Sequence, residues 1–540
     1  MNIIEKITLY VPDAQITEGV VPEVTVKPES VHALAKQLRD GELQFDFLRH
    51  LTGMDWGNEG LGVIYHLEST KFGYQLMIRT VVPGRSEHPE IPTVSDIWKT
   101  AELNEREVFD YFGIVFTNHP DMRRLFLREN WKGYPLRKDY DEASNPLDMT
   151  NEEPNDNTST YEADSNGKVT AKQHKLFDDD EYVINIGPQH PATHGVLRFR
   201  VSLEGEILKK LDVHCGYIHR GIEKMCENLS YPQTLALSDR LDYLSAMQNR
   251  HAVCMCVEKA MGVEISERAQ YIRTIMDELQ RINSHLLFFS TLCMDLGALT
   301  AFFYGFRDRE KILEILEPTT GGRLIFHYNT IGGVQADIHP DFVRKVKEFT
   351  VYMRKQLREY HEVFSGNIIA HQRMDGVGIL SREDAISFGV TGPAGRASGW
   401  ACDVRKRHPY AVYDKVDFKE PIYTSGDCYD RYIIRMDEII ESMNIIDQLI
   451  DNIPEGDYQV KMKPIIRIPE GRYYAAVETS RGELGVFIES QGDKTPYRMK
   501  FRSTGLTLVA CMDTITRDSK IADLIAIGGT LDYIVPDIDR

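Results

Sequence analysis

The chain has 540 residues, more than a single hydrophobic core usually supports, so its length predicts at least two domains. Hydrophobic residues make up 42% of the chain and charged residues 27%, proportions that are ordinary for globular proteins. The 63 lysines and arginines face 82 aspartates and glutamates, and this formal charge of -19 argues against nucleic acid as a partner.

Residues 1–141 have the pattern of a mixed α/β domain. HALAKQLRDG predicts a short helix that ends at a glycine, and GVIYHLEST and GYQLMIRTVV predict two strands separated by a turn. An amphipathic helix is predicted over residues 93–114, with an apolar face formed by Ile97, Ala101, Val108 and Phe112. Residues 116–140 are rich in basic and aromatic side chains without a period, which indicates an extended arm lying on another surface or, alternatively, a solvated loop.

The composition changes abruptly over residues 142–178. Asn, Asp, Glu, Ser and Thr dominate this segment, and large apolar residues are almost absent. Such a segment cannot bury enough apolar surface to offset the entropy lost on ordering, so we expect a flexible acidic linker. The linker would separate a first domain at residues 1–141 from a second at residues 179–540.

Four histidines open the second domain. EYVINI and VLRFRVSLEG alternate apolar and polar residues, which predicts neighbouring strands, and the loop GPQHPATHG between them carries His190 and His194. A third strand in LKKLDVHCGYIHRG leads into a second loop with His214, His219 and Arg220. Imidazoles titrate near neutral pH and suit proton delivery, although any one of these histidines taken alone fits a role in satisfying backbone groups better.

The rest of the second domain is mostly helical in pattern, which makes the overall fold class α+β. Ser266 is a plausible N-cap for a long core helix. Further helices are predicted over residues 237–262, 342–364 and 432–451, and together they suggest a helical bundle with the strand hairpin at one end. Near the C-terminus, RYYAAVETS, GELGVFIES and RMKFRS predict strands.

Several segments together resemble one family. NIGPQHPATHGVLR, YIHRGIEK, SDRLDYLSAM, MDLGALTAFF, TGPAGRASGWACDVRKRHPY and IGGTLDYIVPDIDR resemble the 49-kDa (D) subunit of respiratory complex I. NEREVFDYFGIVFTNHPDMRRLFLRENWKGYPLRKDY resembles its 30-kDa (C) subunit. The chain therefore resembles a fused C/D subunit of bacterial NADH:quinone oxidoreductase, and the resemblance covers nearly the whole chain outside the linker.

The resemblance implies a quinone-reducing site, formed with the subunit that carries the terminal iron–sulfur cluster. It assigns His194 and Tyr243 to the quinone headgroup, Asp295 to the acid that pairs with His194, and Arg220 to a position beside the cluster; His190 is a further quinone-binding candidate. Taken alone, Tyr243 would fit a core tyrosine and Asp295 a helix end. Quinone reduction takes two protons, which a histidine and a tyrosine can donate, although a tyrosine with a pKa of about 10 must be reprotonated by its neighbours.

No electron carrier is expected in the chain itself. The sequence has no G-x-G-x-x-G loop and no C-x-x-C pair among its eight cysteines, so we expect no metal site or bound cofactor, with the iron–sulfur cluster and FMN in partner subunits. No apolar run approaches the roughly 20 residues that cross a bilayer, so we expect a cytoplasmic chain, peripheral on the bacterial inner membrane and bound to the membrane arm. The alternative is an assembly scaffold of a related membrane-bound oxidoreductase with another electron donor.

The D part also resembles the large subunit of nickel–iron hydrogenases, which hold their metal through two C-x-x-C pairs. The corresponding C-terminal stretch, GGTLDYIVPD, contains no cysteine, so hydrogenase activity is excluded.

One segment, RLIFHYNTIGGV, departs from the family pattern R-M-H-x-x-Y-x-R-x-G-G. Ile325 takes the position of a histidine close to the terminal cluster, and Thr330 falls near the arginine position. Because an ionisable neighbour stabilises the reduced cluster, its loss is expected to lower the cluster's potential. This favours menaquinone over ubiquinone as the acceptor.

Overall fold

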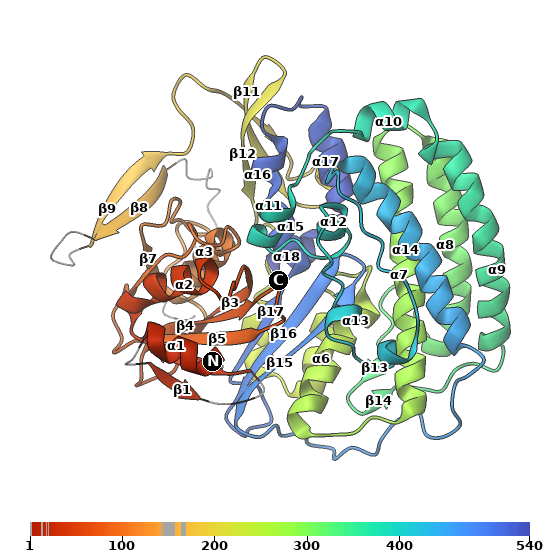
Figure 1. The fold of residues 1–540 in the computed structure, drawn as a ribbon, viewed down its shortest axis with the longest axis horizontal. Coiled ribbons are helices and arrows are strands. Elements are labelled where there is room, and N and C mark those ends of the chain that lie inside the picture. Colours follow the sequence, from red (N-terminus) through yellow and green to blue (C-terminus); the bar gives the residue numbers. More distant parts are fainter. Residues whose placement is uncertain are drawn as a thin grey trace. The chain divides into compact units, whose positions relative to one another are not determined.

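A computed structural model describes residues 3–11, 14–17, 19, 21–141, 143, 157–163 and 169–540. The chain divides into two compact units (Figure 1). The first contains residues 1–184, 214–219 and 386–389, and the second contains residues 185–213, 220–385 and 390–540. The prediction of mixed α/β content is confirmed, whereas the domain boundaries at 1–141 and 179–540 stay predictions.

The first unit is built on a five-stranded sheet with the strand order β1-β2-β5-β4-β3. β2 and β5 pair in parallel and the other neighbours pair antiparallel. The helix predicted at HALAKQLRDG is α2 (Val31–Asp40), and the two predicted strands are β4 and β5, so all three predictions are confirmed. The strands are β1 (Gln15–Thr17), β2 (Glu23–Val26), β3 (Phe47–Asp55), β4 (Leu61–Glu68) and β5 (Gln75–Val82).

The helix predicted over residues 93–114 is shorter in the structure. It is α3 (Ala101–Phe112), and the prediction is wrong for residues 93–100, which form turns. Glu105 explains the difference, because its carboxylate accepts hydrogen bonds from the Val94 amide, at 2.8 Å, and from the Thr93 hydroxyl. These contacts fold residues 93–94 back onto the helix, and burial raises the pKa of Glu105 to about 8.

The basic and aromatic segment after α3 packs against that helix and is not a solvated loop. Oδ2 of Asp110 accepts hydrogen bonds from the amides of Leu125, Phe126 and Leu127 at 3.2, 2.8 and 3.0 Å. Oδ1 of Asp110 accepts a 2.9 Å hydrogen bond from Arg124, and Leu125 and Phe126 are buried. The surface on which the predicted arm lies therefore belongs to its own unit.

The predicted linker contains a hairpin. β8 (Asn157–Ala163) pairs antiparallel with β9 (Val169–Lys175), so the expectation of a structureless segment is wrong for these residues. The amides of Asn118 and Met122 donate to the carbonyls of Tyr161 and Ser159 at 2.6 and 2.8 Å. Composition measures only the apolar surface available for burial, whereas this hairpin is held by backbone hydrogen bonds.

The second unit packs four long helices next to one another (Figure 1). α7 begins as predicted at Ser266, whose hydroxyl accepts a 3.2 Å hydrogen bond from the Ala269 amide. Phe289 of α7 stacks on Tyr360 of α9 with ring centroids 4.3 Å apart. The predictions over residues 342–364 and 432–451 are confirmed as helices; the four are α7 (Glu267–Asp295), α8 (Leu299–Thr320), α9 (Phe342–Tyr360) and α14 (Cys428–Leu449).

The helix predicted over residues 237–262 is interrupted. α5 (Tyr231–Ser238) and α6 (Ala246–Met261) are separated by a turn at residues 239–245. Within it, the Asp242 carboxylate accepts a 2.9 Å hydrogen bond from the Leu244 amide, a local contact that competes with the helical ladder. The break moves Tyr243 out of a helix and into a turn.

The predicted strands of the second domain are confirmed as two three-stranded sheets, in the orders β10-β11-β12 and β15-β16-β17. No described helix is long and apolar enough to cross a membrane. The strands are β10 (Tyr182–Ile186), β11 (Arg198–Glu204), β12 (Ile207–His214), β15 (Gly471–Thr479), β16 (Gly482–Ser490) and β17 (Arg498–Arg502).

The acceptor role of Asp110 leads to a stability prediction. In Asp110→Ala three amides lose their acceptor and Arg124 loses a buried counter-ion, so we expect the first unit to lose about 3 kcal/mol of unfolding free energy. Urea unfolding followed by tryptophan fluorescence would measure this, because three of the four tryptophans, Trp56, Trp98 and Trp131, lie in this unit. Asp139→Ala is the control, since this exposed carboxylate pairs with Arg85 at the surface. Equal effects of the two substitutions would contradict the assignment.

Candidate functional site

The end of α7 meets the loop between β10 and β11 through one short contact. Nε2 of His194 lies 2.7 Å from Oδ2 of Asp295, and the two side chains are 17% and 8% exposed. Asp295 is the last residue of α7, and His194 follows the short helical turn Pro191–Thr193 of the loop. The structure therefore brings together two of the residues that the sequence singled out.

The surroundings of His194 favour its protonated form. Burial alone would lower the pKa of the imidazole, but the hydrogen bond to Asp295 and the charges of Asp295 and Asp532 outweigh it, so the pKa of His194 is raised. An imidazolium near neutral pH can donate a proton to a bound molecule and still be held by Asp295.

The loop that carries His194 is fixed against the C-terminal helices. Thr193 is fully buried, and its hydroxyl donates at 2.8 Å to the carbonyls of His190 and Gly195. The Tyr533 hydroxyl donates to the Thr193 carbonyl at 3.2 Å, and the Tyr533 ring lies 6.4 Å from the His194 ring, centroid to centroid. His190 itself is exposed, so its side chain does not share the enclosure of His194.

Gly529, in α17 (Asp523–Leu531), leaves room for the His194–Asp295 contact. A Cβ atom at this position would lie 3.2 Å from Oδ2 of Asp295 and 3.6 Å from Cε1 of His194. The absence of a side chain therefore allows α17 to pack against the contact without separating its two partners.

Tyr243 is half-buried in the turn between α5 and α6. Burial raises the pKa of its phenol, Arg481 lowers it, and the charges of Asp242 and Asp532 raise it again, so the net pKa is raised. Among the described residues, none forms a hydrogen bond with the Tyr243 hydroxyl. The phenol is thus protonated at neutral pH and is available to a ligand.

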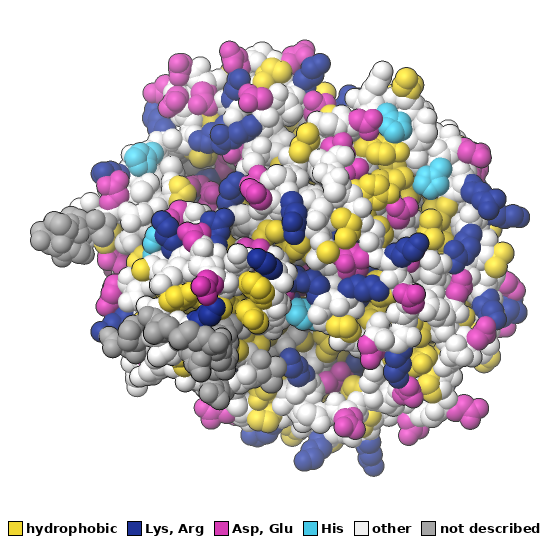
Figure 2. Space-filling model, viewed as in Figure 1, with side chains coloured by type: hydrophobic (Ala, Val, Ile, Leu, Met, Phe, Trp, Pro, Cys, Tyr) yellow, Lys and Arg dark blue, Asp and Glu magenta, His cyan; other side chains and the backbone are white. Residues whose placement is uncertain are grey.

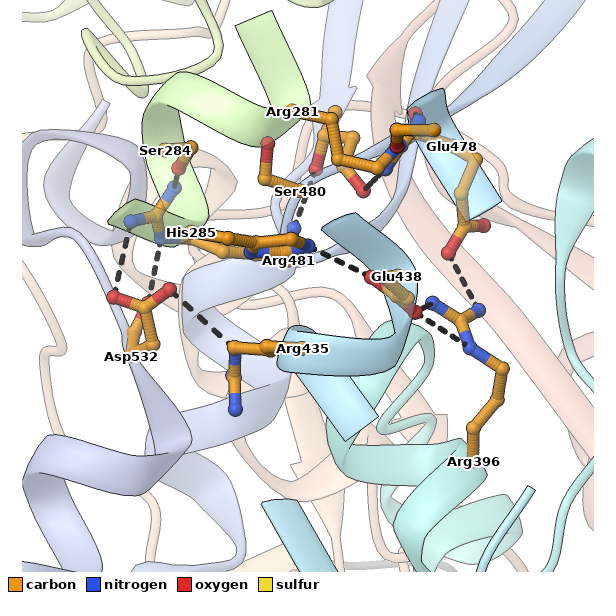
Figure 3. A network of polar contacts seen from close by, with 12 residues as sticks. Arg281, Ser284, His285, Arg396, Arg435, Glu438, Glu478, Ser480, Arg481 and Asp532 are labelled. Carbon is orange, nitrogen blue, oxygen red and sulfur yellow. Dashed lines mark hydrogen bonds and ion pairs between the residues drawn. The ribbon is translucent and has the colours of Figure 1, made fainter. Parts of the chain in front are cut away.

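Arg481 connects the surroundings of Tyr243 with those of His194. Figure 3 shows its guanidinium between Ser284 and Asp532. Its Nη1 donates at 3.0 Å to both Asp242 and Ser284. Its Nη2 and Nε donate to the Asp532 carboxylate and carbonyl at 3.0 and 2.6 Å. The sequence pattern gives no sign of Arg481 or Asp532, because an arginine in the turn TSRG between two strands has the pattern of a solvated position.

Arg220 contacts the turn that carries Tyr243. Its Nη2 donates to the carbonyl of Arg240 at 3.0 Å, and the side chain is exposed. Partial burial and the charge of Arg240 lower the pKa of Arg220, and Asp539 opposes them. Arg220 remains charged at neutral pH and is joined to the backbone three residues before Tyr243.

The segment around Ile325 contains an ionisable group, His327, which lies outside the family positions named in that segment. Nδ1 of His327 lies 2.9 Å from Oδ2 of Asp239, which also accepts a 2.9 Å hydrogen bond from Arg250. Partial burial and the charges of Arg250 and Arg240 lower the pKa of His327, so its imidazole is neutral near pH 7.

Two family models match the chain. "Respiratory-chain NADH dehydrogenase, 30 Kd subunit" matches residues 24–146, and "Respiratory-chain NADH dehydrogenase, 49 Kd subunit" matches residues 295–467 and 460–540. The NADH-quinone oxidoreductase C/D subunit of Phocaeicola vulgatus is 73% identical over 517 residues, 96% of this chain and 99% of the relative. The chain belongs to the family of fused C/D subunits of NADH-quinone oxidoreductase.

Other relatives show both the fused and the separate form. The C/D subunit of Bacteroides thetaiotaomicron is 69% identical over 526 residues, covering 95% of this chain and 99% of the relative. The separate NADH-quinone oxidoreductase D subunit of Bacillus cereus is 44% identical over 361 residues, 67% of this chain and 99% of the relative. In the present fused chain the 49 Kd match includes Asp295, Arg481 and Asp532, whereas His194 and Tyr243 precede it.

The packing of Gly529 predicts an effect on the titration of His194. In Gly529→Ala the added methyl group would separate His194 from Asp295, so the pKa of His194 is expected to fall. Imidazole NMR signals followed against pH would measure this, with the His194 signal identified by its loss in His194→Gln. Gly528→Ala is the matched control, because its Cβ would meet only Tyr533 at an ordinary 3.5 Å. An unchanged pKa in Gly529→Ala, or an equal fall in both variants, would contradict the packing.

The ion pair also predicts how stability depends on pH. The folded-state pKa of His194 is raised above its unfolded value of about 6.5, so the contribution of the pair is fully present below pH 6.5 and is lost as pH rises through the folded pKa. Asp295→Asn should cost about 1–2 kcal/mol at pH 5.5 and less at pH 9. Urea unfolding at both pH values tests the sign. Asp375→Asn, which breaks an exposed pair with His371, should show little pH dependence, and a cost of Asp295→Asn that grows with pH would refute the assignment.

Proposed function

We propose that this C/D subunit forms a quinone-reducing site together with the partner subunit that carries the terminal iron–sulfur cluster. The observation that carries the proposal is the enclosed His194–Asp295 pair, a proton donor with a raised pKa at the tip of a fixed loop. In this proposal the chain is a peripheral-arm subunit on the cytoplasmic face of the bacterial inner membrane, and it binds no cofactor of its own.

The proposed chemistry converts a quinone to a quinol with two electrons and two protons. Both electrons come from the partner's cluster, which is supplied through FMN and further clusters in other subunits. His194 donates one proton to one carbonyl oxygen of the quinone, and the Tyr243 hydroxyl donates the other proton to the second oxygen. Asp295 orients the imidazole and stabilises its protonated form. Because the pKa of Tyr243 is raised, the phenolate is quickly reprotonated from surrounding water or acids.

Arg220 is proposed to lie beside the cluster of the partner. Its contact with the Arg240 carbonyl connects it to the turn that carries Tyr243, so a cluster next to Arg220 would be close to the quinone end of the electron path. A fixed positive charge at this place favours the reduced, more negative form of the cluster.

The preference for menaquinone remains a proposal based on Ile325. His327 is the nearest histidine in the segment, and its lowered pKa keeps it neutral, so it supplies no positive charge that would replace the missing histidine. A cluster with fewer positive neighbours has a lower potential, which matches the lower potential of menaquinone.

The D part is proposed to share the layout of the hydrogenase large subunit, a helical bundle with strands at its end, without the metal site. All eight cysteines are buried, and burial raises the pKa of Cys254 and Cys511 to about 12, so these two thiols are protonated at neutral pH. Among the described residues, no group of three or more His, Cys, Asp or Glu side chains is arranged to hold a metal ion.

Apolar side chains near the site support docking to the membrane arm. α8 starts four residues after Asp295 and exposes Leu299 and Phe303, at 58% and 64%. α10 (Ile368–Met374), which packs against α17, exposes Ile368 and Ile369 at 70% and 60%. Hydrophobic side chains gather on the visible face just below α10 (Figure 2). A partner that covers this surface would also shield a quinone from water.

The proton donors are tested in the assembled complex. Tyr243→Phe and His194→Ala should each lower quinone reductase activity by about 10- to 100-fold, because each removes a hydrogen-bond donor to the headgroup. Reduction of an artificial acceptor and the paramagnetic signal of the cluster should stay unchanged. Arg220→Ala is expected to act differently and to lower the cluster's potential.

Two results would change the proposal. Normal quinone turnover in both the His194 and Tyr243 variants would refute the site. Failure of the complex to assemble with these substitutions, while the isolated chain stays folded, would favour the assembly-scaffold alternative.

A further inference from the structure

We propose that Arg481 is a positioning residue that sets the distance between the two proton donors of the quinone site. The inference rests on the proposed function and adds a residue that touches neither donor directly. Arg481 is fully buried in the turn between β15 and β16 and acts through Asp242 and Asp532.

One guanidinium connects both donors through short paths. On one side, Arg481 donates to the carboxylate of Asp242, the residue before Tyr243. On the other side it donates to the carboxylate and carbonyl of Asp532, the residue before Tyr533. The Tyr533 hydroxyl in turn binds the Thr193 carbonyl, one residue before His194. A displacement of the guanidinium would therefore move the two donors relative to each other.

The positive charge of Arg481 also offsets the negative charges of Asp242 and Asp532 at Tyr243. Asp532 raises the pKa of both His194 and Tyr243, and Arg481 opposes this effect at Tyr243. Arg481 thus keeps Tyr243 a better proton donor than Asp242 and Asp532 alone would allow.

Arg481 is itself held in place by Arg281 of α7, which Figure 3 shows, and by Gln248 of α6. Arg281 donates at 2.7 Å to the carbonyls of Glu478 and Thr479, at the end of β15. The amide of Ser480 donates to the side chain of Gln248 at 3.2 Å. The third partner of the guanidinium, Ser284, lies on the same helix as Arg281 and Asp295. The helix α7 therefore both fixes Arg481 and carries Asp295.

Only arginine can make this connection. Its planar fork uses Nε, Nη1 and Nη2 in fixed directions, and here it donates to two carboxylates, one carbonyl and one hydroxyl. A lysine keeps the charge, but its single nitrogen cannot hold both sides at the same separation. Arg481→Lys therefore tests position with the charge preserved.

The experiment measures quinone reductase activity of the assembled complex carrying Arg481→Lys. We expect kcat for quinone to fall at least about 10-fold, with the KM for quinone changing less, because a displacement of about 1 Å is enough to cost such a factor. Reduction of an artificial acceptor and the signal of the cluster should be unchanged. Arg106→Lys is the matched control: Arg106 is also buried, but it lies in the first unit, where it pairs with Asp121 and donates to the carbonyls of Arg123 and Arg124. In this variant kcat per assembled complex should stay at the wild-type level.

Ser284→Ala provides a second test in case the complex with Arg481→Lys does not assemble, because it removes one contact of the guanidinium and no charge. It should lower kcat for quinone by a smaller factor, about two- to five-fold. Three results would overturn the inference. The first is wild-type kcat in assembled Arg481→Lys, and the second is an equal loss of kcat in Arg481→Lys and Arg106→Lys. The third is unchanged kcat in Ser284→Ala when Arg481→Lys does not assemble. If His194→Ala and Tyr243→Phe both retain quinone turnover, the proposed function is refuted. If those two variants lose turnover and Arg481→Lys keeps it, only the positioning role of Arg481 is refuted.

Discussion

Charged side chains inside the second unit must be paired, because removing one partner leaves a buried ion at a cost of about 3–5 kcal/mol. Arg396 forms ion pairs with Glu438 of α14 and Glu478 of β15, and Glu438 also contacts His285 of α7 at 2.8 Å (Figure 3). A shift of any of these elements along its neighbour would separate such pairs. The register of α7, α14 and the β15–β16 turn is thus set by charge pairing as well as by apolar packing.

Because α7 also carries Asp295, its register fixes the position of the site. Arg281, Ser284, Phe288, Leu292 and Asp295 follow at steps of three and four residues, so they share one face of the helix. From one end to the other, this face contacts the end of β15, the guanidinium of Arg481, the guanidinium of Arg435 over the Phe288 ring, and the imidazole of His194. A site placed on such a helix is positioned more rigidly than a site made from loops alone.

The sequence predicted most regular elements, because periodicity reports which face of a helix or strand is buried. α7 began at its predicted N-cap, and the strands around GPQHPATHG were in place. Periodicity failed where a side chain competes with the backbone ladder, as Glu105 does before α3 and Asp242 does within residues 237–262. Of the site, His194, Tyr243 and Asp295 came from family motifs. Arg481 and Asp532 could not be predicted, because their role depends on contacts between segments far apart in sequence.

The central claim is that a quinone headgroup binds between His194 and Tyr243, and photoaffinity labelling tests it most directly. An azido-quinone with the azide on its ring would be irradiated in the assembled complex, with excess unlabelled quinone as the competitor, and labelled peptides would be identified by mass spectrometry. We predict competed labelling of residues 187–197 and 239–245 of this chain. Labelling that excess quinone displaces from other subunits, with neither of these segments modified, would contradict the account.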